Sequence, residues 1–279
     1  MTTVSQLLQQ ASQLQNISDT AQLDCEILLC HLLSVDPSWL RTWPDAEVSS
    51  QQVAQFEVLL ASRIQGMPIA HLIGSRGFWT LDLKVTPDTL IPRPETEHLV
   101  EKALALPLPA DSRVLDLGTG TGAIALALAA ERSDWQLTAV DCQPEALAVA
   151  RHNCQRHQLA NVQLIESNWF SNIPIKAPKF DLIVSNPPYI YSEDPHLQQG
   201  DLRFEPITAL VSGAEGLEDL RTIVDQSRDY LKPKGWLLVE HGYQQGLAVR
   251  ELFAAAGFTE VSTQRDYNRQ ERISFGQWL

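Results

Sequence analysis

From residue 113 onward, the 279-residue chain alternates short apolar runs with helix-like segments, and this alternation constrains its fold most. The apolar runs predict strands over 113–117, 136–141, 162–166, 180–185, 236–241, 258–264 and 271–278. Helical periodicity spans 122–131, 144–157, 216–231 and 244–256. Such alternation is typical of a mostly parallel sheet with helices on both faces. We therefore expect an α/β domain with a seven-stranded, mostly parallel sheet.

The N-terminal region carries only helical signals. Apolar residues at positions 4, 7, 8, 11 and 14 form one helical stripe, and two further helices are expected, one ending at Asp36-Pro37 and one running from Ser50 to Gly66. Three short helices are enough to form a small bundle.

The pattern changes after this bundle. Ile69–Ile73, a glycine-containing turn and Phe78–Val85 read as strand, turn and strand, which predicts a β-hairpin. The chain then divides into a helical domain over 1–68, a hairpin linker over 69–88 and an α/β domain over 89–279.

Composition narrows the function classes. The formal net charge of -13 argues against holding long nucleic acid by phosphate neutralisation. The first residues lack the pattern of a secretory signal, and no apolar window is long enough to span a membrane. The four cysteines and seven histidines show no metal-ligand spacing. We expect a cytoplasmic protein with reduced thiols, no bound metal and, by default, a monomeric state.

A glycine-rich loop follows the first predicted strand of the α/β domain. The run Asp116-Leu117-Gly118-Thr119-Gly120-Thr121-Gly122 leads directly into a helix, where an α/β sheet binds a nucleotide-like ligand. Asp141 ends the next strand and can accept hydrogen bonds from both ribose hydroxyls. These features fit either NAD or S-adenosylmethionine.

The position of Asp116, two residues before Gly118, favours the methyl donor, because this run resembles the loop of class I methyltransferases. By that resemblance Asp116 orients the methionine end of the donor. Asn168 and Trp169 follow the third strand, where such folds enclose adenine: Asn168 is placed to hydrogen-bond the ring and Trp169 to cover it. A buried core role is the alternative for Trp169.

The most specific motif follows the fourth strand and reads Asn186-Pro187-Pro188-Tyr189. Prolines have no N–H and fix φ, so this turn presents carbonyl oxygens on a stiff frame. The Asn186 side-chain oxygen and the Pro187 carbonyl can accept both hydrogens of a planar NH2 group, while Tyr189 packs on the flat group. We assign Asn186, Pro187 and Tyr189 to catalysis and all four residues of the turn to substrate binding, and count Asn186 among the donor-binding residues as well.

A planar NH2 nitrogen is a poor nucleophile because its lone pair is delocalised. Two acceptors raise its electron density and aim it at the donor methyl group, so positioning and electrostatics carry the rate. We assign no general base, since the proton can leave after transfer. Adenine, cytosine and glutamine all present such a group, and the turn does not choose among them.

Several motifs together resemble the bacterial release factor glutamine methyltransferases, the PrmC/HemK family. They are the run Ile91-Pro92-Arg93-Pro94-Glu95-Thr96-Glu97, the glycine loop, the Asn186 turn and Arg203-Phe204-Glu205-Pro206, and the resemblance covers nearly the whole chain. It implies a Rossmann-like class I fold, S-adenosylmethionine as donor, and methylation of the Gln side-chain amide in the Gly-Gly-Gln loop of peptide chain release factors. The helical domain then helps to grip the protein substrate.

The chain departs from the family pattern at two positions. Asn168 stands where relatives often carry Asp, and Phe204 where they often carry Tyr. The charged residues Arg93, Glu95, Glu97, Arg203 and Glu205 are open to two interpretations, an ion-pair network that holds a lid or direct contacts with substrate.

Three other functions remain as alternatives. A glutamine methyltransferase acting on a ribosomal protein would use the same pocket. An N6-adenine methyltransferase on DNA or RNA would need base flipping and a phosphate-holding surface, which the acidic charge disfavours. A non-catalytic binding module would bind the donor without turnover.

Overall fold

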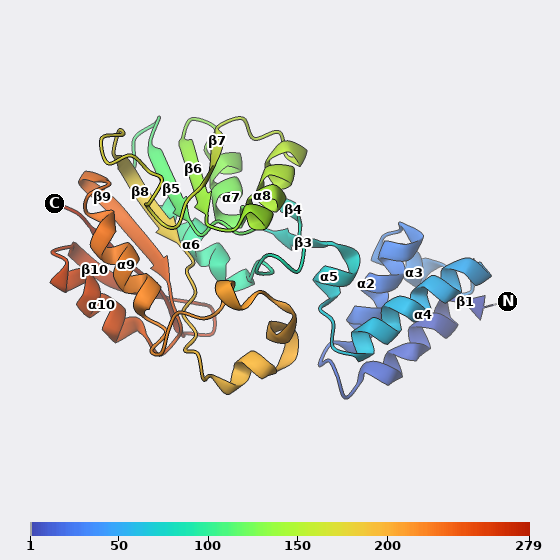
Figure 1. Cartoon of the computed structure of the whole chain (residues 1–279). Coiled ribbons are helices and arrows are strands. Elements are labelled where there is room, and N and C mark those ends of the chain that lie inside the picture. Colours follow the sequence, from blue (N-terminus) through green and yellow to red (C-terminus); the bar gives the residue numbers. More distant parts are fainter. Residues whose placement is uncertain (1) are drawn as a thin grey trace. The chain divides into compact units, whose positions relative to one another are not determined.

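A computed structural model of the chain describes residues 2–279, which form two compact units (Figure 1). The first unit comprises the chain up to Ser75 together with His196–Phe204. The second comprises Arg76–Pro195 and Glu205–Leu279. No helix among the described residues is both long and apolar enough to cross a lipid bilayer.

The first unit is helical, as the sequence predicts, but it contains more helices than the expected three. The helices are α1 (Val4–Leu8), η1 (Gln9–Leu14), α2 (Ala21–Leu33), α3 (Pro37–Thr42), α4 (Ser50–Ile64) and α5 (Ile69–Ile73). The segment His196–Phe204 contains most of η3 (Pro195–Gln198) and all of η4 (Gly200–Phe204), which are short 3-10 turns. Strands β1 (Thr2–Thr3) and β2 (Glu47–Val48) pair antiparallel. Side chains of Thr3 and Ser49 close capping boxes at the starts of α1 and α4.

One buried ion pair ties two helices of this unit together. Arg63 Nε of α4 donates to Asp24 Oδ2 of α2 across 2.7 Å, and Arg63 Nη1 donates to the Met67 carbonyl across 3.1 Å. Around this pair, apolar side chains from α1 to α4, including Leu7, Leu28 and Phe56, form one core.

The predicted strand at residues 69–73 is wrong, because Ile69–Ile73 is helix α5. A five-residue apolar run fits a buried strand and a helical turn equally well, and here the flanking residues decide. Pro68 precedes the helix, and Gly74 ends it with a φ of 72°, a left-handed conformation that favours glycine. The hairpin begins later, with β3 (Ser75–Phe78) and β4 (Leu81–Lys84).

The second unit contains the predicted seven-stranded sheet, in the order β10-β11-β9-β8-β5-β6-β7. Its strands are β5 (Arg113–Leu117), β6 (Gln136–Asp141), β7 (Val162–Glu166), β8 (Phe180–Ser185), β9 (Leu231–Glu240), β10 (Thr259–Arg265) and β11 (Glu271–Gln277). Strands β7, β6, β5, β8 and β9 pair in parallel, whereas β11 and β10 add antiparallel. The predicted fold class is confirmed.

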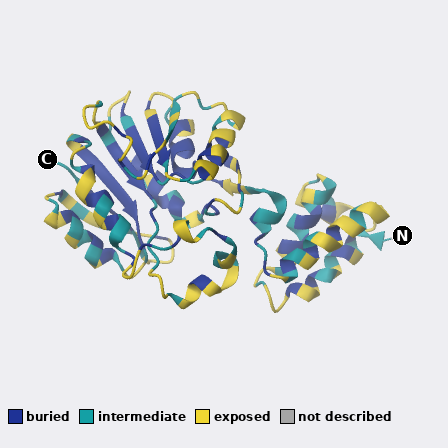
Figure 2. Ribbon diagram, in the orientation of Figure 1, coloured by how far each residue is buried: buried dark blue, intermediate teal, exposed yellow. Residues whose placement is uncertain are grey.

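Helices cover both faces of this sheet, whose central strands are largely buried (Figure 2). Along β5, Val114 packs toward α6 (Glu97–Leu104) and α7 (Ala123–Glu131), while Leu115 packs toward α9 (Glu218–Ser227) and α10 (Gly246–Ala255). Successive residues of a strand face opposite sides, so an all-apolar strand needs helices on both. Helix α8 (Pro144–Arg156) and the short turns η2 (Pro94–Thr96) and η5 (Ile207–Ala209) complete the unit. Helix α6 is not predicted from the sequence.

Within the second unit, a single buried amide fastens strand β4 of the hairpin to helix α8. Asn153 of α8 is fully buried; its Oδ1 accepts from Lys84 N at 2.8 Å, and its Nδ2 donates to the carbonyls of Lys84 and Thr121 at 3.1 and 2.9 Å. The same side chain therefore joins β4, α8 and the loop before α7.

We expect Asn153→Ala to lower the free energy of unfolding by about 2 to 4 kcal/mol, because it leaves buried backbone groups without partners. Urea denaturation of the full chain measures this, with His152→Ala, at an exposed position of the same helix, as the control. Equal stability of the two variants would contradict the assigned role.

Candidate active site

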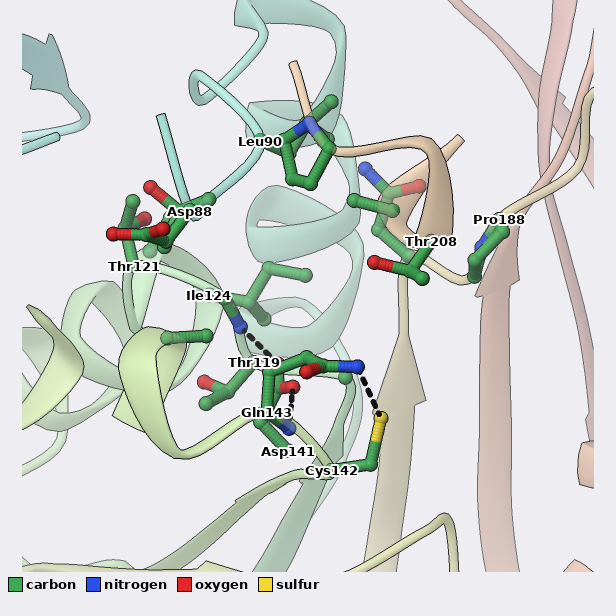
Figure 3. Close-up of a pocket in the computed structure, with 18 of the residues that line it drawn as sticks. Asp88, Leu90, Thr119, Thr121, Ile124, Asp141, Cys142, Gln143, Pro188 and Thr208 are labelled. Carbon is green, nitrogen blue, oxygen red and sulfur yellow. Dashed lines mark hydrogen bonds between the residues drawn. The ribbon is translucent and has the colours of Figure 1, made fainter. Parts of the chain in front are cut away.

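A cavity lies at the carboxyl ends of β5, β6 and β8, where the strand order changes direction. Its wall also includes residues 88–90, 92 and 93 before η2 and residues 206, 208 and 209 around η5, and every lining residue belongs to the second unit. Figure 3 shows Asp88, Thr119, Asp141, Pro188 and Thr208 among the side chains that line it.

The predicted glycine loop forms the floor of this cavity. Gly118, Gly120 and Gly122 have φ values of 68°, 55° and 87°, a region that side-chain-bearing residues rarely adopt. A Cβ on Gly122 would lie 2.9 Å from the Leu126 side chain, whereas one on Gly120 would meet nothing within 4 Å. Gly120 therefore leaves space on the cavity side, and Thr119 and Thr121 line the cavity beside it.

Asp116 lies beneath this loop and does not line the cavity. Its carboxylate is completely buried, and Oδ2 accepts from the Thr119 hydroxyl at 2.6 Å and from Ala125 N at 3.2 Å. Oδ1 is buried without a hydrogen-bond partner among residues 2–279. Burial raises the pKa of Asp116 to about 7, although both hydrogen bonds oppose this shift. The structure thus gives Asp116 a role in holding the loop, and its contact with a donor stays a prediction.

Asp141 ends β6 and combines two roles. Its Oδ2 accepts from Gly120 N at 2.9 Å and its Oδ1 from Gln143 N at 3.0 Å, which fixes the carboxylate against the loop. The residue also lines the cavity. Each carboxylate oxygen keeps a further lone pair, so Asp141 can still accept from a pair of hydroxyls. Burial raises the pKa of this carboxyl.

The residues after β7 form another wall. Trp169 and Asn168 both line the cavity, and the Trp169 ring would lie 3.2 Å from a Cβ placed on Gly118. The indole is fixed by a hydrogen bond from Nε1 to Asp219 Oδ1 at 3.2 Å. Trp169 has a φ of 48°, an uncommon conformation for a bulky residue. Trp169 is therefore half-buried and at the same time faces the site.

The Asn186 turn reaches the cavity through two of its four residues. Asn186 and Pro188 line the wall, and Asn186 Nδ2 donates to Thr96 Oγ1 across 3.1 Å. Pro187 is buried, and the half-buried Tyr189 donates from its phenol to Glu240 Oε1 across 3.4 Å. Burial and the neighbouring Glu240 raise the pKa of Tyr189, so the phenol keeps its proton. The contacts of Pro187 and Tyr189 with a target group stay predictions.

The charged residues left open by the sequence divide between the units. Glu205, whose side chain is fully buried, accepts from Ile91 N at 2.7 Å and pairs with Arg93, so this pair holds residues 91–93 at the cavity wall. Glu97 accepts from Trp79 N at 2.8 Å. Arg203 belongs to the first unit, where its Nε donates to the Gly200 carbonyl at 3.1 Å and its guanidinium lies over the Phe204 ring. Arg93 and Glu205 therefore form an ion pair, and because Arg93 also lines the cavity, both the lid role and direct contact with substrate stay predictions.

Three polar residues of the site are missing from the sequence prediction. Thr96 contacts Asn186, Asp219 fixes Trp169, and Glu240 holds Tyr189. Glu240 could have been found, because it ends its strand at the same sheet edge as Asp141 and Asn186. Asp219 carries no such signal, since it lies in the first turn of α9.

Comparison with known proteins gives matches over both units. Residues 6–74 match the family model of the PrmC N-terminal domain, and residues 108–272 match that of a methyltransferase domain. A release factor glutamine methyltransferase from Pseudomonas aeruginosa is 52% identical over 278 residues, covering 100% of this chain and 99% of the relative. One from Escherichia coli is 48% identical over 267 residues, covering 96% of this chain and 95% of the relative.

Solved structures share the fold. A methyltransferase from Pyrococcus furiosus superposes with a TM-score of 0.54 at 21% identity, covering 82% of this chain and 98% of that chain. The catalytic domain of hMettl16, solved with a 3′UTR hairpin, superposes with a TM-score of 0.57 at 16% identity, covering 90% of this chain and 92% of that chain.

The strand order, the glycine loop and the acidic end of β6 define a methyltransferase of the class I fold. Within that class, the chain belongs to the release factor glutamine methyltransferase family, because nearly full-length relatives of that name reach about half identity. The expected family resemblance is confirmed.

The buried Asp116 carboxyl makes stability depend on pH. Its pKa of about 7 lies above the unfolded value near 3.9, so the folded state binds more protons between these limits and loses stability as pH rises toward 7. Asn keeps an oxygen for Thr119 and Ala125 but cannot ionise. We expect Asp116→Asn to gain about 2 to 4 kcal/mol relative to the parent between pH 4.5 and pH 8. Urea unfolding of the donor-free protein at both pH values measures this gain, and a pH-independent difference would contradict it.

Proposed function

We propose that this protein transfers a methyl group from S-adenosylmethionine to the side-chain amide nitrogen of the Gln in the Gly-Gly-Gln loop of peptide chain release factors. The observation that carries the proposal is the placement of Asn186 in the wall of the same cavity as the glycine loop and Asp141. A donor site and an amide-binding turn therefore share one enclosed space.

The residues of the cavity suit the donor. Asp141 faces the place where ribose hydroxyls would bind, and the open side of Gly120 allows the backbone to approach a ligand closely. Trp169 offers an apolar ring face and Asn168 a polar side chain for an adenine. The bound donor supplies an electrophilic methyl group on a positively charged sulfur.

The chain's own contribution is to hold and orient the acceptor. With Asn186 Nδ2 donating to Thr96, the Asn186 carbonyl oxygen is the end of the amide left for a target NH2 group. The Pro187 carbonyl provides the second acceptor on a frame that the two prolines stiffen. Together they raise electron density on the amide nitrogen and fix its direction, and water takes the proton after transfer.

The choice of a protein substrate rests on the N-terminal unit and the family. Residues 6–74 match a domain model specific to the PrmC proteins, and relatives at 48–52% identity carry the release factor name. The net charge of -13 disfavours a nucleic acid acceptor. We place the activity in the cytoplasm, where release factors act, and propose that the enzyme is a monomer.

A labelling experiment tests this assignment. Purified protein and methyl-labelled S-adenosylmethionine are offered to an intact release factor, the same factor with its loop Gln replaced, a ribosomal protein mixture and duplex DNA. We expect label on the intact factor alone. Label on ribosomal protein or DNA would contradict the proposed substrate and identify another one. Donor binding without transfer to any acceptor would contradict the proposed activity.

Two substitutions separate donor binding from turnover. Asn186→Ala removes the acceptor for the target amide, so we expect turnover to fall about a hundredfold or more, with donor affinity falling far less. Asp141→Ala should instead weaken donor affinity about tenfold or more, because it removes the hydroxyl acceptor and loosens the loop. Calorimetric titration with the donor and single-turnover rates measure both, and a variant with nearly normal turnover at Asn186 would contradict the assignment.

A further inference from the structure

The orientation of the Asn186 amide decides whether this site can bind a target NH2 group. An Asn side chain accepts hydrogen bonds at Oδ1 and donates at Nδ2, and only the accepting end can hold a target amide. The structure has Nδ2 donating to Thr96 Oγ1. A hydroxyl both donates and accepts, however, so Thr96 alone would tolerate either orientation of the Asn186 amide.

Glu240 removes this ambiguity. The Thr96 hydroxyl interacts with the Glu240 carboxyl and lowers its pKa, and the chemistry of the pair gives the direction, because an ionised carboxylate can only accept. Thr96 therefore gives its one proton to Glu240 and has only lone pairs left for Asn186. Asn186 must therefore turn its NH2 end toward Thr96, and its Oδ1 remains free to accept from the target.

The fold brings these three groups together from separate elements. Glu240 is the last residue of β9, Asn186 follows the adjacent parallel strand β8, and Thr96 ends η2. Both Thr96 and Glu240 are buried, with 4% and 1% of their surface exposed. Tyr189 also donates to Glu240, so both ends of the Asn186 turn depend on one carboxylate.

Burying the Glu240 carboxylate at this position lowers the stability of the fold. Glu240 Oε2 has no hydrogen-bond partner in the described part of the chain, and burial raises the pKa of Glu240 to about 7. An unsatisfied buried oxygen lowers stability, so local packing does not account for Glu240. Exceptions of this kind gather at functional sites.

We propose that Glu240 and Thr96 are positioning residues that fix the Asn186 amide with its oxygen toward the target nitrogen. The proposal rests on the proposed function and adds to it the hydrogen-bond chain that makes the turn an acceptor. Neither residue needs to touch the substrate for this effect.

Paired threonine variants test the proposal. Thr96→Val keeps the shape but removes the hydroxyl, and Thr96→Ser restores it. We expect kcat on a release factor to fall about tenfold or more in Thr96→Val and to stay within about threefold of the parent in Thr96→Ser, with donor Kd changing less than about twofold in both. Thr138→Val, at a buried threonine of β6 outside the cavity wall, is the matched control.

Glu240→Gln tests the pH dependence of kcat, which a role in packing alone would not change. Around Glu240, Arg272 of β11 lowers its pKa and Glu95 of η2 raises it, while Tyr189 donates to it. Ionisation of Glu240 should make kcat of the parent rise between about pH 6 and pH 8. In Glu240→Gln we expect a lower kcat without this rise. If this variant does not fold, the threonine pair decides alone.

Side-chain amide NMR keeps this test separate from the proposed activity. The Asn186 NH2 signals, assigned by their loss in Asn186→Asp, should show a hydrogen-bonded proton in the parent and in Thr96→Ser but not in Thr96→Val. A Thr96→Val variant with parental kcat and an unchanged NH2 signal overturns the proposal while leaving the function intact. A parent that methylates no acceptor overturns the proposed function, and the NMR comparison still decides the amide orientation.

Discussion

The anchoring of the glycine loop between the buried carboxylate of Asp116 and the half-buried carboxylate of Asp141 is the constraint on which the rest of the site depends. Asp116 holds the loop from below through Thr119 and Ala125, and Asp141 holds it from the side through Gly120. Both carboxyls have raised pKa values because they are buried. These contacts fix the loop from below and from the side, and Gly120 leaves space for a ligand on the cavity side.

Parallel strand pairing extends this arrangement across the sheet edge. Asp141, Asn186 and Glu240 each stand at or just after the end of a strand, and the parallel register brings these ends to one edge. Strand ends also leave backbone groups without ladder partners, so polar side chains there can bind each other or a ligand. The proposed donor site, the proposed acceptor site and the proposed positioning of Asn186 therefore all depend on one geometric property of the sheet.

Local sequence patterns were sufficient to predict much of this fold. The predicted strands 113–117, 136–141, 162–166 and 180–185 agree with the observed bounds. Most of these strands are buried parallel strands, which form nearly continuous apolar runs. Prediction failed at Ile69–Ile73, where five apolar residues fit two structures and the caps at Pro68 and Gly74 decided for a helix. Helix α6 was missed because only the motif that precedes it, which ends at Glu97, was interpreted.

The sequence by itself determined the fold class, the donor loop, the Asn186 turn and the family, since each depends on residues close together in the chain. Only the tertiary structure decided that Asp116 lies under the loop, that Glu205 holds Arg93, and that Thr96 and Glu240 meet behind Asn186. The physical reason is separation along the chain: Thr96 and Asn186 are 90 residues apart, and no local pattern reports which distant polar groups share a buried hydrogen bond.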